Sequence, residues 1–133
     1  MNDSDRFTRP EDILIAALLE SKRQAPQLVY EFGPFRLDVT DQRVTRDGEP
    51  IPLPPKEFET LQCLLEAGGR LVTQQELLAR VWQGVNVEVG TIAQRISALR
   101  KALGRDEAGR DYIETVPRRG YRFNPELLPR ATE

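Results

Sequence analysis

Short runs of apolar residues that alternate with polar ones occupy residues 29–53 and predict β-strands. The runs cover residues 29–32, 35–39, 43–46 and 49–53. Asp47-Gly48 separates the last two runs, and this pair favours a tight hairpin because both residues tolerate a positive φ. Pro50 and Pro52 restrict the last strand to a short segment or to a sheet edge. We therefore expect a small antiparallel sheet of three or four strands.

The hydrophobic period changes to that of amphipathic helices after residue 53. Pro54-Pro55 opens the first expected helix and Gly68-Gly69 ends it. The second begins at Thr73, because Thr73 and Glu76 have the spacing of a capping box, and Gly84 ends it. The apolar stripes of the two helices are Phe58, Leu61, Leu64 and Leu65, and Leu77, Leu78, Val81 and Trp82.

A third helix is expected from about Val89 to Leu103, with Gly104 beyond its end. Its core stripe is Ile92, Ile96, Leu99 and Leu103. The opposite face carries Gln94, Ser97, Ala98 and Lys101, with Arg95 and Arg100 on its two shoulders. A slim face with hydrogen-bonding groups and flanking cations suits the major groove of DNA. A basic helix that faces only solvent is the alternative.

A β-hairpin is expected after the third helix, with strands at residues 112–116 and 121–123. Its turn holds Arg118 and Arg119, and Arg122 follows closely. Arginine at such a turn suits a minor groove or a flanking phosphate, because its planar fork donates in fixed directions. A solubilising loop is the alternative for the hairpin by itself. Two consecutive basic elements together favour a nucleic-acid partner.

The distribution of charge supports this interpretation. The chain has a net charge of −2 and a pI near 5.4, but residues 91–122 hold eight basic residues against four acids. That segment is therefore +4 and the remainder is −6. Such asymmetry indicates an anionic partner for the C-terminal part, with a solvated basic face as the alternative.

Composition excludes several classes of site. The 133 residues contain no histidine, which rules out imidazole bases and histidine-ligated metals, and we expect neither an enzyme nor a cofactor. Cys63 is the single cysteine, so an internal disulfide and a multi-cysteine zinc site are excluded. The apolar run Ile13–Leu19 is too short to span a membrane, and the polar start does not resemble a signal peptide. We expect a cytoplasmic protein.

The first residues differ from the rest of the chain. A helix is expected over roughly 10–23, between Pro10 and Pro26, with a wide apolar face. That face is expected to pack against the domain or against a second copy, and to take no part in reading DNA. The chain thus divides into an N-terminal extension (1–28), a domain (29–126) and a C-terminal tail (127–133).

Four segments carry a family resemblance: PFRLD, RVTRDGEPIPLPPKEFETLQCLLEAGGRLVTQQELLARVW, TIAQRISALRKAL and YIETVPRRGYRF. Together, from about Phe32 to Phe123, they resemble the winged-helix effector domain of OmpR/PhoB-type transcription regulators. The resemblance implies an α+β fold, a winged helix-turn-helix with an N-terminal four-stranded antiparallel sheet, a three-helix bundle and a C-terminal β-hairpin wing. It also implies a sequence-specific regulator that binds double-stranded DNA.

Carried over by position, the recognition helix is about 89–103 and the wing is 117–122. Gln94, Arg95 and Ala98 would approach base edges, beside Ser97 on the same face, and Thr91, Arg100 and Lys101 would approach the DNA backbone. The wing contacts would be Arg118, Arg119 and Tyr121. Trp82 matches a position that packs the bundle and can also touch a phosphate. Loop 83–90 matches the segment that meets RNA polymerase in activators of the family.

The chain also departs from the family pattern. Gly90 replaces an arginine of many relatives, and Ser97 and Ala98 replace basic residues, so the operator sequence cannot be transferred. The PRRGYRF wing is similar to that of ToxR/CadC-like regulators, in which the domain leads a longer, often membrane-anchored chain. We expect either a stand-alone regulator or the head of a longer one, and helix-turn-helix proteins of this type often bind two half-sites as a homodimer. A winged helix used for protein–protein interaction is the alternative from another class.

Overall fold

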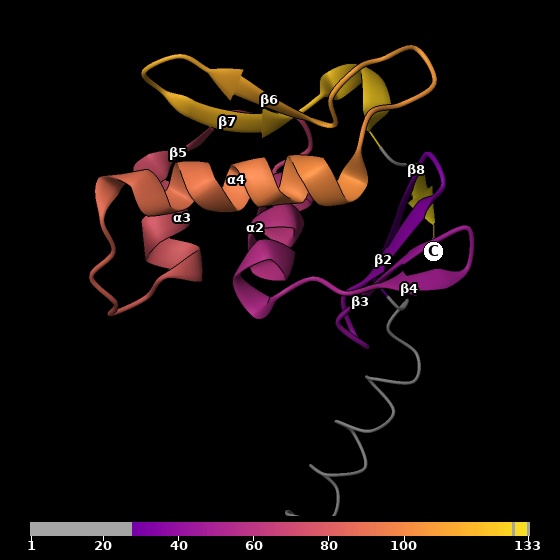
Figure 1. The fold of residues 1–133 in the computed structure, drawn as a ribbon, viewed down its shortest axis with the longest axis horizontal. Coiled ribbons are helices and arrows are strands. Elements are labelled where there is room, and N and C mark those ends of the chain that lie inside the picture. The colour runs from indigo at the N-terminus through magenta and orange to yellow at the C-terminus, as the bar shows by residue number, and fades with distance from the viewer. Residues whose placement is uncertain (1–27, 129, 133) are drawn as a thin grey trace, which may run out of the picture.

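The computed structural model describes residues 28–128 and 130–132 and comprises a sheet, a helical bundle and a second, smaller sheet (Figure 1). Its elements are β1 (Val29–Phe32), β2 (Phe35–Asp38), β3 (Arg43–Arg46), β4 (Glu49–Ile51), α2 (Pro55–Glu66), β5 (Val72–Thr73), α3 (Gln74–Val81), α4 (Val89–Leu103), β6 (Ile113–Val116), β7 (Gly120–Phe123), the 3-10 helix η2 (Pro125–Leu127) and β8 (Arg130–Thr132). The helix expected over 10–23 lies outside the described residues.

The four expected N-terminal strands are confirmed and form an antiparallel sheet. The apolar members of the alternating pattern, Phe32, Phe35, Leu37 and Val44, face the core and are buried. Asp47 and Gly48 both have a positive φ, of 51° and 85°, as the hairpin between β3 and β4 requires. The alternation therefore fixes which face of this sheet is buried.

Two strands were not expected, β5 and β8. β8 pairs with β1, with Val29 opposite Thr132, so that the sheet has five strands in the order β4-β3-β2-β1-β8. The sequence analysis assigned these residues to a C-terminal tail. A three-residue strand at a sheet edge is held by backbone pairing, and it is too short for a period of two to be recognised.

The three expected helices are present with the expected boundaries. Pro55 occupies the first turn of α2, and Thr73 caps α3 in a capping box, with its Oγ1 accepting from the Glu76 N–H at 3.0 Å. Gly104, with a φ of 67°, follows α4. Helices α3 and α4 form the helix-turn-helix, and α2 packs against both of them.

The C-terminal hairpin of β6 and β7 is joined by β5 in a three-stranded sheet of order β5-β7-β6. The backbone at Gly120 lies so close to β5 that a Cβ there would be 2.1 Å from the carbonyl oxygen of Val72. β5 has two residues and directly precedes α3. The hairpin is thus fixed to the start of the helix-turn-helix.

A single core joins these layers. The predicted stripe of α4, Ile92, Ile96, Leu99 and Leu103, is buried in it. The core includes a cluster of four aromatic rings: Phe32, Phe35, Tyr112 and Phe123. The centroid of the Phe32 ring lies 5.2–5.6 Å from the centroid of each of the other three rings. They connect the N-terminal sheet to the base of the hairpin.

In the described part of the chain, no helix has the length and apolar character needed to cross a membrane.

Candidate nucleic-acid interface

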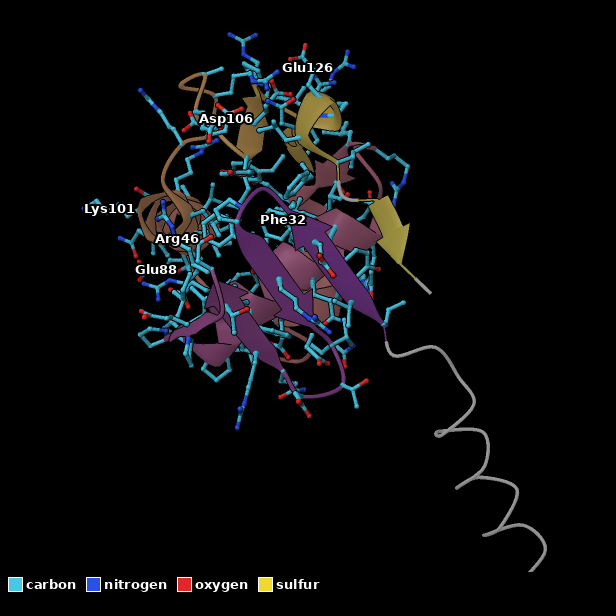
Figure 2. All side chains as sticks on the ribbon, turned by 90° about the vertical axis from the view of Figure 1, so that its right-hand side faces the viewer. Phe32, Arg46, Glu88, Lys101, Asp106 and Glu126 are labelled. Carbon is cyan, nitrogen blue, oxygen red and sulfur yellow. The ribbon has the colours of Figure 1, made fainter. Side chains whose placement is uncertain are left out.

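The outward face of α4 is built as the hydrophobic period predicts. Gln94, Ser97 and Lys101 are exposed, and Thr91 and Ala98 are half-buried. Figure 2 shows Lys101 reaching outward at the margin of the molecule. No residue described by the structure forms an ion pair with Lys101. This face therefore combines hydrogen-bonding groups, one small apolar side chain and a free cation.

Arg95 is placed differently from Gln94 and Ser97. Its Nη1 donates to Oε1 of Glu57 on α2 at 2.8 Å, and Glu57 is buried. The guanidinium thus lies between α4 and α2 rather than wholly on the outward face. Sequence analysis did not identify Glu57, although this residue lies four positions before Leu61 and therefore on the buried stripe of α2.

Arg100 connects α4 to the hairpin. Its Nε donates to the carbonyl oxygen of Ile113 at 3.0 Å, and its Nη2 donates to Oγ1 of Thr115 at 2.6 Å. Both acceptors belong to β6, and neither is an acid. Arg100 consequently holds the hairpin against α4 and keeps its positive charge uncompensated by any carboxylate of the described residues.

The turn of the hairpin presents two cations. Arg118 and Arg119 are both exposed, and Arg118 has a φ of 66°. Neither makes an ion pair within the described ranges. Together with residues 71 and 73–75, they line a surface hollow at the start of α3. The turn and the N-terminus of α3 thus form one concave, cationic surface.

Two expected contact residues lie in the core. Tyr121 is 6% exposed and Trp82 is 5% exposed. Tyr121 stands opposite Val72 in the β5–β7 pair, and Trp82 follows directly after α3. The structure therefore gives both side chains a packing role, and it does not bring them to the outward face with Gln94 and Ser97.

The other basic residues of segment 91–122 are neutralised by acids. Arg105 pairs with Asp111, Arg110 with Asp106 and Glu126, and Arg122 with Glu114, at N–O distances of 2.7–3.2 Å. The backbone N–H of Arg110 and the Arg110 side chain hydrogen-bond Asp106 and lower the pKa of its carboxyl. Within segment 91–122, four cations remain without an acidic partner among the described residues: Arg100, Lys101, Arg118 and Arg119.

Loop 83–90 joins α3 to α4 and includes the start of α4. Val85 within it is 54% exposed, whereas Val87 packs against the core. Lys56 donates from Nζ to the carbonyl oxygen of Val81 at 2.6 Å, which satisfies the C-terminus of α3 just before the loop. The loop is thus anchored at both ends and exposes an apolar side chain between them.

Known proteins share this architecture. The chain is 31% identical to the DNA-binding domain of Escherichia coli CadC, with a TM-score of 0.65 over 79% of this chain and 96% of that one. It is 28% identical to the DNA-binding domain of Klebsiella pneumoniae RstA, solved in complex with the RstA box, with a TM-score of 0.63 over 73% of this chain and 97% of that one.

Longer regulators match as well. The chain is 41% identical over 95 residues to the phosphate regulon transcriptional regulatory protein PhoB of Pseudomonas aeruginosa, covering 71% of this chain and 41% of PhoB. It is 39% identical over 99 residues to the transcriptional regulator HilA of Salmonella typhi, covering 74% of this chain and 18% of HilA. The chain therefore spans well under half the length of these relatives. Residues 48–123 match the family described as "Transcriptional regulatory protein, C terminal", and the chain belongs to this OmpR/PhoB-type family of winged-helix domains.

Proposed function

We propose that this chain binds double-stranded DNA in a sequence-specific manner as the DNA-binding part of a transcription regulator. One observation carries the proposal. All four cations of segment 91–122 that lack an acidic partner in the described structure lie on α4 or on the hairpin turn. Unpaired cations beside a row of exposed hydrogen-bonding side chains are what the phosphates and base edges of a duplex require.

The positions of the side chains suggest how the work is divided. Gln94 and Ser97 are exposed on α4 and would donate to or accept from base edges in the major groove, and the methyl group of Ala98 suits a thymine methyl. Thr91, Lys101 and Arg100 would contact the backbone beside them. Arg118 and Arg119 would contact flanking phosphates or the minor groove. Tyr121 and Trp82 would act through packing, because both are buried.

The comparisons support this function by similarity. RstA, a protein of the same fold, was solved with the RstA box bound, and PhoB and HilA are named as transcriptional regulators. The exposed α4 face and the free cations described above are the features of this chain that would serve the same purpose.

Selection of bound sequences from a random duplex pool tests the proposal. We expect one enriched motif, and an affinity for it that falls steeply as salt rises, because bound counterions are released from DNA. Gln94→Ala should relax the preference at one base position and cost about 1–3 kcal/mol at the preferred site. Gln62→Ala, on α2, is the matched control and should leave the motif unchanged. Recovery of no motif, together with salt-independent binding, would contradict the proposal.

Two further contacts are proposed on the same domain. Loop 83–90 would meet RNA polymerase through the exposed Val85, and Val85→Ser should then reduce activated transcription in vitro without changing DNA affinity.

A homodimer would form on DNA, as helix-turn-helix proteins often bind two half-sites. The mass of the complex on a selected duplex, measured in solution, decides between one copy and two.

A further inference from the structure

The ion pair beneath α4 is incompletely satisfied. Glu57 lies in the first turn of α2, and its side chain is 3% exposed. Its Oε1 accepts from Arg95 Nη1 at 2.8 Å, while its Oε2 and the Nε of Arg95 are both buried without a partner. The two groups are therefore joined through one pair of atoms and not through the two parallel hydrogen bonds that a guanidinium and a carboxylate can form.

Stability alone does not explain this arrangement. Removing a carboxylate and a guanidinium from water is expensive, and well-packed apolar residues at such a site are often as stable or more stable. A carboxylate beneath the DNA-facing helix also repels phosphates. With an uncharged residue at position 57, the stability of the fold and the affinity for non-specific DNA would therefore each be equal or higher.

Arg95 reaches from this buried carboxylate to the surface. Its side chain is 37% exposed, against 3% for Glu57. On the helix, Arg95 lies one turn from Thr91 and from Ala98, both half-buried at the margin of the outward face. Only Nη1 is used by Glu57, so donors of Nη2 remain for a group outside the protein.

We propose that Glu57 is a positioning residue for DNA recognition. By holding Nη1, it fixes the direction in which the remaining donors of Arg95 meet a base edge. By cancelling the charge of Arg95, Glu57 keeps this arginine from adding to the sequence-independent attraction between the protein and DNA phosphates. Arg95 then contributes discrimination between sequences rather than general affinity. This inference rests on the proposed DNA-binding function.

Glu57→Gln tests the proposal, because the amide keeps the shape of the carboxylate and removes its charge. Affinity for a random duplex should rise about fivefold, as expected for one cation that is no longer compensated at the surface. The salt slope should steepen by about one unit. The ratio of preferred to random binding should fall about tenfold, the discrimination that one well-placed arginine supplies.

Glu59→Gln is the matched control. It removes the same charge from the same helix, but Glu59 is 47% exposed and pairs with Lys56 at 3.3 Å. We expect the ratio of preferred to random binding to stay within about twofold, because exposed pairs contribute little. Thermal unfolding of both variants shows whether each is folded at the assay temperature.

Arg95→Lys is the second variant and decides the outcome if Glu57→Gln does not fold. Lysine keeps the charge and loses the planar fork, so the salt slope should be unchanged while the ratio falls about tenfold. If the wild type selects a motif but Glu57→Gln and Arg95→Lys both keep the wild-type ratio, the positioning role is overturned and DNA binding stands. If the wild type selects no motif, the proposed function itself fails.

Discussion

The turn of the β6–β7 hairpin and the loop between α4 and β6 are both exposed and both rich in arginine, yet they differ in charge. Arg118 and Arg119 in the turn have no acidic partner among the described residues. In the loop, Arg105 pairs with Asp111, and Arg110 pairs with both Asp106 and Glu126. Figure 2 shows Asp106 and Glu126 on the same side of the molecule.

The difference shows that a count of basic residues overestimates the surface available to an anion. An arginine that faces a carboxylate stabilises a loop through an ion pair. An arginine with no carboxylate beside it keeps its charge available to attract a phosphate. In the loop, Asp106 accepts from the backbone N–H groups of Ala108 and Arg110 and from the Arg110 guanidinium. The loop arginines are therefore part of the fold, whereas no carboxylate of the described residues neutralises the turn arginines.

The strongest test removes the cations of each region in turn. Arg118→Ala with Arg119→Ala should weaken binding to preferred and random DNA alike, by about tenfold to a hundredfold for two charge-assisted contacts. The salt slope should flatten by about one unit for each lost phosphate contact. Affinities measured at several salt concentrations give both quantities.

Arg105→Ala with Arg110→Ala is the control for that pair of substitutions. It removes the same number of positive charges from the paired region and should change DNA affinity by no more than about twofold, because those charges are already compensated. Equal losses in the two double variants would show that pairing does not separate the two regions.

A second test moves the free cations without removing them. Gly120→Ala would place a Cβ 2.1 Å from the Val72 carbonyl oxygen, so β7 must shift away from β5. We expect a loss of about 1–3 kcal/mol in the free energy of unfolding, the usual range for overpacking, with weaker DNA binding at every salt concentration. Thermal unfolding and a binding titration measure the two effects.

Gly90→Ala is the matched substitution. A Cβ at Gly90 meets no atom within 4 Å, and the residue lies in the first turn of α4. Alanine should therefore leave the free energy of unfolding unchanged or raise it by up to about 1 kcal/mol. An unaltered stability in Gly120→Ala would show that β5 does not hold the hairpin.

The smallest effect is expected from the paired region. Hydrogen bonds from the backbone N–H and the side chain of Arg110 lower the pKa of Asp106 below its ordinary value. The carboxylate therefore stabilises the fold fully above its unfolded pKa, and this contribution is lost as the pH falls through the lowered value. Asp106→Asn should unfold at a slightly lower temperature than the wild type at neutral pH, and the difference should shrink in acid.

Glu107→Gln, in the same loop, removes an exposed carboxylate that has no ion pair among the described residues and serves as the control. Its unfolding temperature should follow that of the wild type at each pH. A constant difference between Asp106→Asn and the wild type from neutral to strongly acidic pH would contradict the pKa argument.

The elements of the fold were predictable where a local pattern was long enough. Alternation located the first four strands, and Asp47-Gly48 located the turn between β3 and β4, because each signal lies within a few residues. The capping box at Thr73 located the start of α3 for the same reason. β5 and β8 have two and three residues, and their pairing with β7 and β1 depends on segments far away in the chain.

The candidate site was predictable only in part. The helical period correctly separates Gln94, Ser97 and Lys101 from the core stripe of α4. It does not reveal that Arg95 meets a carboxylate 38 residues earlier, or that Arg100 bonds to β6. Those partners are set by how α2 and the hairpin pack on α4, and periodicity within a single helix carries no information about its neighbours.

The pairing of β8 with β1 has a consequence for how this domain can be joined to others. Val29 and Thr132 lie opposite each other on adjacent strands, whose spacing is about 5 Å. This edge is at the opposite end of the molecule from the hairpin turn (Figure 1). A polypeptide fused before β1 or after β8 would leave from nearly the same point. The domain is therefore suited to circular permutation, with a short linker closing that gap and new ends opened elsewhere on the surface.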